Sequence, residues 1–209
     1  MSTTHLNRWS GWALAVGGIA IAGFFLALFP IGGVTATTAS SPGIYFLAHG
    51  LHTIGGVLAA LGLVGLYARQ SEKTGWLGLI GFILAFIGTT LFAGLGMISE
   101  FLLPPIFTNA PALVAPGGAL DPNNLIIFPL TFLPFLAGYI LLGIATMRAG
   151  VLPRWSGLLL ILGVILFALP VPWPVPVVGA VLYAAGMGWI GYALWTAKGQ
   201  MAGQAKPAM

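Results

Sequence analysis

The sequence predicts an all-α membrane protein: a polytopic bundle of six transmembrane helices with both termini in the cytoplasm. Three observations lead to this fold class: the composition, the lengths of the apolar segments and the positions of the basic residues. The chain has 209 residues, of which 59% are hydrophobic and only 5% are charged. A soluble domain carries about 25% charged residues, so this chain has too little polar surface to remain in water.

Six segments have a length and an apolar character that suit a bilayer. A transmembrane helix needs about 20 mostly apolar residues to cross roughly 30 Å of hydrocarbon. The predicted spans, all in one transmembrane domain over residues 1–209, are residues 9–29, 44–68, 75–99, 122–147, 153–169 and 175–197. The fifth span is short, which leaves a five-span or re-entrant arrangement as an alternative.

The basic residues define the orientation. Once the six spans are laid out, every Lys and Arg falls on the same side of the membrane: Arg8, Arg69, Lys73, Arg148, Arg154, Lys198 and Lys206. Short loops rich in Lys and Arg face the cytoplasm. A five-span chain would move the last two lysines to the opposite side, which argues against it. We therefore expect a multi-pass protein of the cell inner (plasma) membrane.

Tryptophans support this orientation because the indole ring prefers the level of the lipid headgroups. Five of the seven lie at the predicted inner ends: Trp9, Trp12, Trp76, Trp155 and Trp195. The first span has one alternative interpretation, a signal peptide cleaved near residues 36–39. Its apolar stretch is longer than the 7–15 residues usual in such peptides, so we expect the span to be retained.

A short motif is repeated at the starts of the odd-numbered spans. The residues Arg-Trp-Ser-Gly open the first span at 8–11 and the fifth span at 154–157, and residues 76–78 open the third with a weaker Trp-Leu-Gly version. The even-numbered spans all end near a base. This pattern predicts three helical hairpins of the same orientation, a parallel repeat. The alternative is convergence, because every inner boundary favours Trp and a base.

Small residues inside the spans predict close helix packing. Gly18 and Ala22 are four positions apart, as are Gly56 and Ala60. Lipid tails are as apolar as leucine, so membrane helices associate where small residues let their backbones approach. Outside the spans, residues 101–121 form the longest connection, which is rich in proline and glycine but also apolar. We expect it to lie in the outer interface or to fold over the outer end of the bundle.

The candidate site begins on the second span. Tyr45, His49 and His52 lie on one helical stripe that descends from the outer end, because their spacing keeps them within about a 60° arc. On the third span, which runs in the opposite direction, Thr89 and Glu100 share a face. Glu100 is expected near the outer entry of the second span, with the two histidines about one and two turns below.

Three interpretations of this candidate site remain open. In the first, each histidine donates a hydrogen bond to a Thr, a carbonyl or Glu100 and so joins the helices. In the second, His49, His52 and Glu100 bind a proton, a metal or a polar ligand in an outward-facing pocket, since an ionisable residue within a span is by default a functional hypothesis. The third, a bis-histidine haem site, is disfavoured because both ligands lie on one helix.

Parts of the chain resemble small bacterial multi-span membrane proteins of unknown function. The residues that carry this resemblance run from Met147 to Gly163, where a base and a glycine, then Leu-Pro, lead into a Gly-Leu-Leu-rich span; residues 65–86 and 188–195 look similar too. The match covers about a quarter of the chain. It implies a small multi-span membrane fold, and no activity or cofactor.

These observations predict a structural, accessory or sensory membrane component that acts through partners. The partners are expected to be the lipid bilayer and either other membrane subunits or a second copy of the chain. Nucleic acid is excluded as a partner, because the bases form no run. A small-molecule or ion carrier that uses the His/Glu face is the alternative. No nucleophile–base pair or phosphate loop is present, so an enzyme is less expected, and no cofactor is predicted.

Overall fold

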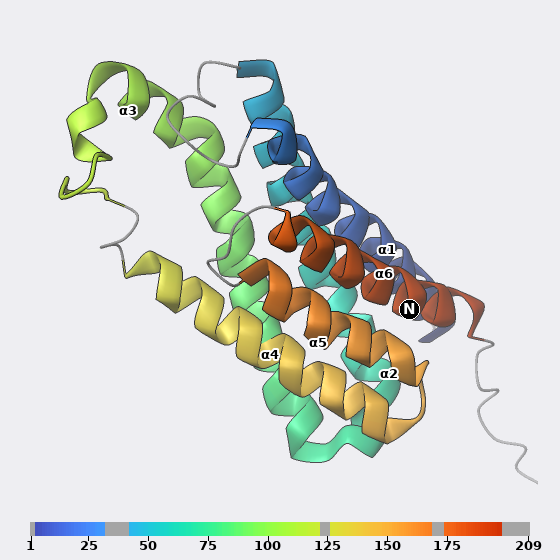
Figure 1. Cartoon of the computed structure of the whole chain (residues 1–209). Coiled ribbons are helices and arrows are strands. Elements are labelled where there is room, and N and C mark those ends of the chain that lie inside the picture. The colour runs from blue at the N-terminus through green and yellow to red at the C-terminus, as the bar shows by residue number, and fades with distance from the viewer. Residues whose placement is uncertain (1–2, 32–41, 122–125, 169–173, 198–209) are drawn as a thin grey trace, which may run out of the picture.

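The computed structural model describes residues 3–31, 42–121, 126–168 and 174–197, and within these ranges it contains helices and turns but no β-strand (Figure 1). The main helices are α1 (Thr3–Leu28), α2 (Pro42–Met97), α4 (Ile127–Ala149), α5 (Arg154–Ala168) and α6 (Val175–Thr196). The all-α prediction is therefore confirmed. The chain ends, including Lys198 and Lys206, and the predicted start of the fourth span at residue 122 lie outside the described residues.

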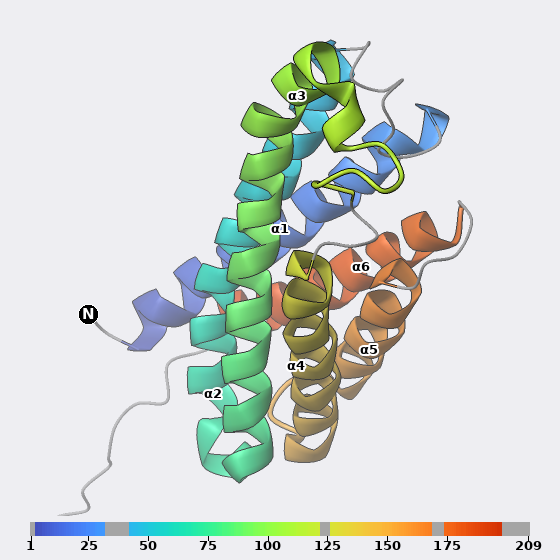
Figure 2. The ribbon, with the colours of Figure 1, turned by 90° about the vertical axis from the view of Figure 1, so that its left-hand side faces the viewer.

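Helix α2 is two antiparallel arms joined at one residue. Gly75 adopts φ 52° and ψ −146°, a conformation that glycine reaches without a steric penalty because it lacks a Cβ. There the chain reverses, so that residues 42–74 and residues 76–97 run side by side (Figure 2). The second and third predicted spans are thus the two arms of one α2 hairpin, and the helix continues through residues 69–74 between them.

The outer connection is mostly helical. After α2 the chain forms a π-helix (η3, Ile98–Leu102), then α3 (Leu103–Asn109), and a 3₁₀ turn (η4, Pro111–Leu113). Two prolines in the first turn of α3 suit a helix start, because their missing N–H groups would have no intrahelical partner there. Figure 1 shows this segment extending from one end of the bundle, away from the ends of α4 and α5 that meet at Gly150.

Four described stretches are long and apolar enough to cross a membrane: His5–Leu28, Gly43–Asn109, Pro129–Ala149 and Val175–Thr196. The second of these contains the reversal at Gly75. Helix α5 is apolar too, but it has only 15 residues. The structure thus establishes several long apolar helices.

The helices form a closed ring in chain order. Helix α1 packs on α2, α2 on α4, α4 on α5, α5 on α6, and α6 returns to α1. The ring closes where the Arg8 guanidinium lies over the Trp195 ring, 5.9 Å from its centroid. The start of α1, the Gly75 turn, the α4–α5 turn and the end of α6 all lie toward one end of the bundle (Figure 1).

Glycine makes each contact in this ring close. A Cβ on Gly17 would fall 2.7 Å from the backbone nitrogen of Ala59, between α1 and α2. A Cβ on Gly138 would overlap the backbone of Ala85, between α4 and α2, and one on Gly163 would overlap the backbone of Tyr183, between α5 and α6. The predicted packing of small residues is confirmed at Gly18 and Gly56, which face α6 and the second arm of α2.

The repeated motif occupies matching contacts in two places. Gly11 packs against the backbone of Gly191 on α6, and Gly157 packs against the backbone of Gly143 on α4. In each case the motif glycine meets a glycine of the helix that precedes it around the ring. These contacts are compatible with the three-hairpin repeat, which stays a prediction.

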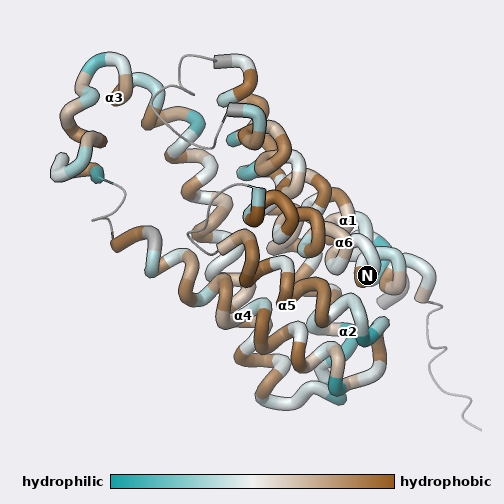
Figure 3. Tube along the Cα trace, viewed as in Figure 1, coloured by the Kyte–Doolittle hydropathy of each residue, from teal (hydrophilic) through white to brown (hydrophobic). Residues whose placement is uncertain are grey.

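The bundle has an interior of aromatic rings and an apolar exterior. Phe25, Phe92, Phe135, Phe167 and Tyr183 come from five different helices, and each ring lies 5.2 to 5.4 Å from the centroid of at least one other. Large apolar side chains are also exposed all around the bundle, while polar side chains such as Asn7 and Thr146 are buried. Figure 3 shows the strongly hydrophilic residues toward the ends of the helices.

Candidate functional site

The predicted stripe on α2 is present and buried. Tyr45, His49 and His52 all lie on the first arm of α2 and are 1%, 1% and 6% exposed. The Tyr45 and His49 rings are 4.2 Å apart between centroids, and the two imidazoles are 6.4 Å apart. Their sequence spacing produces this row directly, because residues three and four apart share one helical face.

Two hydrogen bonds anchor the outer part of the stripe. The Tyr45 hydroxyl donates to the carbonyl of Ser99 over 2.7 Å, which joins the start of α2 to η3, just after the second arm. The Nδ1 of His49 lies 3.0 Å from the carbonyl of Tyr45, one turn earlier. The Nδ1–H tautomer therefore satisfies this carbonyl and leaves Nε2 as the free acceptor nitrogen of the ring.

His52 lies deeper, in an aromatic environment. Its ring centroid is 3.9 Å from that of Phe92 and 4.6 Å from that of Phe24. Neither imidazole nitrogen has a hydrogen-bond partner among the described residues, and the Oγ1 of Thr53 also lacks one. The backbone of Phe92 lies near the imidazole but outside hydrogen-bond geometry. Leaving a buried polar group unpaired costs about 1–3 kcal/mol.

Gly96 explains how the second arm of α2 covers this region. A Cβ at this position would fall 2.6 Å from the Oγ1 of Thr53 and 3.1 Å from the Cγ of His52. Only a glycine lets the two arms approach this closely without displacing one of those side chains. Gly56, the next turn of the stripe, packs against Ala93 in the same way.

The structure brings Glu100 beside the stripe without joining it to the histidines. Glu100 belongs to the π-helix, is partly exposed, and has an Oε1 atom 3.6 Å from the point where a Cβ of Gly50 would lie. Its carboxylate forms no hydrogen bond or ion pair with another described residue. In the described ranges no group of three or more His, Asp or Glu side chains has the geometry of a metal site.

Thr89, the remaining predicted site residue, belongs to a different cluster. Its Oγ1 lies 3.0 Å from the Tyr139 hydroxyl, and the Tyr183 hydroxyl donates to Tyr139 over 2.7 Å. With Tyr183 as donor, Tyr139 keeps its own proton for Thr89. This chain of three hydroxyls is buried and connects α2, α4 and α6. The sequence analysis missed it, although a tyrosine in the middle of an apolar span signals a hydroxyl that needs a partner.

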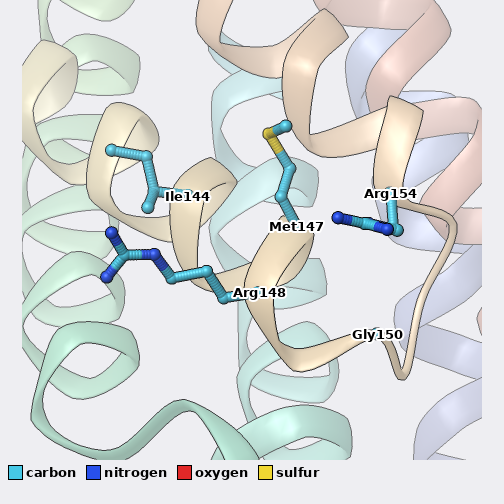
Figure 4. A pocket seen from close by; sticks show the side chains of 5 residues that line it. All are labelled: Ile144, Met147, Arg148, Gly150 and Arg154. Atoms are coloured by element: carbon cyan, nitrogen blue, oxygen red, sulfur yellow. The ribbon is translucent and has the colours of Figure 1, made fainter.

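Two open recesses lie at the other end of the bundle, where the basic residues gather. One, of about 610 Å³, is lined by Ile144, Met147, Arg148, Gly150 and Arg154 (Figure 4). The other, of about 440 Å³, is lined by His5, Arg8, Trp9, Trp12 and Trp195. Both are remote from the histidine stripe, which lies toward the outer ends of the α2 arms.

Comparison with family models, curated proteins and solved structures finds no match to this chain. Its function is therefore argued from geometry. The stripe offers imidazole nitrogens in an apolar environment, which can exchange a proton or hold a polar ligand, and it offers no nucleophile activated by a base. Ligand binding stays a prediction for the five candidate residues Tyr45, His49, His52, Thr89 and Glu100.

Tyr139→Phe tests the hydroxyl chain. The change removes its central member and leaves two buried hydroxyls without partners, so the free energy of unfolding should fall by about 1–3 kcal/mol. Tyr183→Phe should cost less, because the Thr89–Tyr139 bond survives. Thermal unfolding in detergent measures both, with exposed Tyr192→Phe as the control. Equal stabilities for Tyr139→Phe and Tyr192→Phe would show that the chain of hydroxyls contributes nothing.

Proposed function

We propose that this chain is a multi-pass protein of the bacterial inner membrane, with six crossings and cytoplasmic termini, which acts as a structural, accessory or sensory component through partners. The partners are the lipid bilayer and either other membrane subunits or a second copy. One observation supports the membrane placement: large apolar side chains are exposed around the bundle, while polar side chains such as Asn7 and Thr146 are buried.

That distribution is marked on every long helix. Ile19 of α1, Leu61 of α2 and Leu133 of α4 are 66%, 58% and 66% exposed. In water each such side chain would forfeit roughly 1.5–3 kcal/mol of burial, whereas in a bilayer it contacts lipid tails. Some of the buried polar residues, in contrast, find partners inside the ring, as Tyr45 and Thr89 do.

Six crossings are supported by the geometry of α2 and α5. Each arm of α2 is long enough to supply one crossing. Helix α5 has 15 residues, which at 1.5 Å per residue span about 22 Å, short of the roughly 30 Å of hydrocarbon. It packs along both α4 and α6, so a locally thinned bilayer or the flanking residues make up the difference.

A structural role is supported by the hydrogen bonds and aromatic rings that join the helices inside the bundle. The ring is closed, and the hydrogen bonds of Tyr45, Thr89, Tyr139 and Tyr183 run between helices rather than toward a described cavity. The aromatic rings around His52 fill the centre. Such an interior holds helices in place and presents an apolar outer surface to partners in the bilayer.

The carrier alternative is favoured by one specific observation. Both nitrogens of His52 are buried without a partner, an arrangement that a structural side chain rarely adopts. A proton or a small polar ligand that enters between the α2 arms, past Glu100, would satisfy them. A replacement of His52 would abolish transport by a carrier, whereas a structural component would have no transport to lose.

Labelling of single introduced cysteines tests the topology, and the chain is suited to it because it contains no cysteine. Thiols introduced at Lys73 and Arg154 should react with a membrane-impermeant reagent only in inverted vesicles. A thiol introduced at Thr108 in α3 should react in intact cells whose outer membrane has been permeabilised. Labelling of Lys73→Cys or Arg154→Cys from the outside would overturn the six-crossing arrangement.

His52→Phe separates the two functions. If His52 only packs, the change should alter the free energy of unfolding by no more than about 1.5 kcal/mol, because loss of two unpaired buried nitrogens offsets the strain of the larger phenyl ring, and wild-type protein in liposomes should not speed the collapse of a pH gradient. If it carries protons, wild-type protein should collapse the gradient and the variant should not. His5→Phe, outside the stripe, is the control. A flux that needs His52 would contradict the structural role.

A further inference from the structure

The α4–α5 turn has an unusual concentration of unpaired positive charge. Arg148 lies in the last turn of α4, and Arg154 is the first residue of α5. Both are exposed, and neither guanidinium group has a hydrogen bond or an ion pair with another described residue. Figure 4 shows the two side chains on opposite sides of the turn around Gly150, with the Arg148 side chain extending away from Arg154, and the left-handed conformation of Gly150 brings the helix ends together.

The two arginines differ in what already stabilises them. A base in the last turn of a helix is favoured by the helix dipole, so Arg148 is well placed on α4. Arg154 is at the positive end of α5, whose first turn contains no acidic residue, and there the dipole disfavours a cation. An anion at this turn would interact favourably with both guanidinium groups and with the start of α5.

The recess at this turn also has an apolar wall. Ile144 and Met147 lie toward the bundle, and the arginines lie at the turn (Figure 4). Its volume of about 610 Å³ exceeds what a phosphate alone requires. A ligand that matches this wall has a charged phosphate at one end and hydrocarbon at the other.

We propose that this recess binds the headgroup of an anionic phospholipid from the cytoplasmic leaflet. On binding, the Arg148 side chain turns toward Arg154 and both contact the phosphate oxygens, since guanidinium forks match phosphate geometry, and the first acyl carbons lie against Ile144 and Met147. Basic pockets between helices on the cytoplasmic side are suited to such lipids. This inference rests on the proposed membrane function, because it requires this end of the bundle to meet the inner leaflet.

The second recess provides an internal comparison. It lies where α6 meets α1, and Arg8 of the first Arg-Trp-Ser-Gly motif lines it, as Arg154 of the second motif lines the first recess. Arg8, however, already lies over the Trp195 ring, a cation–π contact that offsets part of its charge. The positive charge at the Arg148–Arg154 recess is therefore less offset by the protein, which favours the binding of an anion there.

The test compares two doubly substituted proteins that lose the same charge. Arg148→Gln with Arg154→Gln removes the proposed site, and Arg69→Gln with Lys73→Gln removes two bases from the neighbouring Gly75 turn. Native mass spectrometry in detergent, with phosphatidylglycerol or phosphatidylcholine added, measures lipid retention. The first variant should bind phosphatidylglycerol at least about tenfold more weakly than wild type, because each charge-assisted hydrogen bond to phosphate contributes roughly a factor of ten.

Further measurements identify the source of the phosphate and exclude misfolding. Inorganic phosphate at 10 times the lipid concentration should not displace phosphatidylglycerol, and displacement would overturn the assignment to lipid. Arg148→Lys with Arg154→Lys keeps both charges but loses the fork geometry, so it should restore part of the binding that the glutamine variant loses, which a misfolded protein would not do. Equal losses in the two glutamine variants would overturn the site in favour of diffuse charge attraction. The thiol labelling above tests membrane topology independently, so failure of either proposal is recognisable.

Discussion

The closeness of the helix backbones is the constraint on which the rest of this structure depends. Around the ring, at least one glycine at each contact faces the backbone or the Cβ of the next helix. In a bilayer there is little hydrophobic gain from pairing helices, so van der Waals contact and interhelical hydrogen bonds must hold them. Close approach makes both possible. The Thr89–Tyr139–Tyr183 chain has distances of 3.0 and 2.7 Å because α2, α4 and α6 lie near enough for their hydroxyls to meet.

The same closeness defines the candidate site. Gly96 lets the second arm of α2 lie against His52 and Thr53, and Phe24 and Phe92 then enclose the imidazole. The result is a polar ring with unmet hydrogen-bonding capacity inside an aromatic core, whereas the unpaired arginines lie at the opposite end. The protein thus separates its two chemically distinctive regions along the axis of the bundle. One is buried among helices, and the other is open at the proposed lipid headgroup level.

Sequence patterns predicted the helical class, the small-residue packing and the alignment of Tyr45, His49 and His52 on one helical face, because each depends on composition or on spacing within one helix. They predicted that the second and third spans run antiparallel, but not that helix continues through residues 69–74 and reverses at Gly75, since a lone glycine among helix-forming residues is a weak turn signal. Partners from distant parts of the chain were also inaccessible. Thr89 was assigned to the histidine face by its register, but its hydroxyl meets Tyr139, and that choice depends on how α4 packs.

The most direct test of the glycine account compares two alanine substitutions. A Cβ on Gly138 would overlap the backbone of Ala85, whereas a Cβ on Gly188 would meet nothing within 4 Å. Gly138→Ala should lower the free energy of unfolding by about 1–3 kcal/mol, the usual cost of overpacking. Gly188→Ala should leave it unchanged or raise it by about 0.5–1 kcal/mol, because alanine stabilises a helix interior. If unfolding in detergent shows Gly138→Ala to be as stable as Gly188→Ala, the backbones are not in the contact described, and the account is wrong.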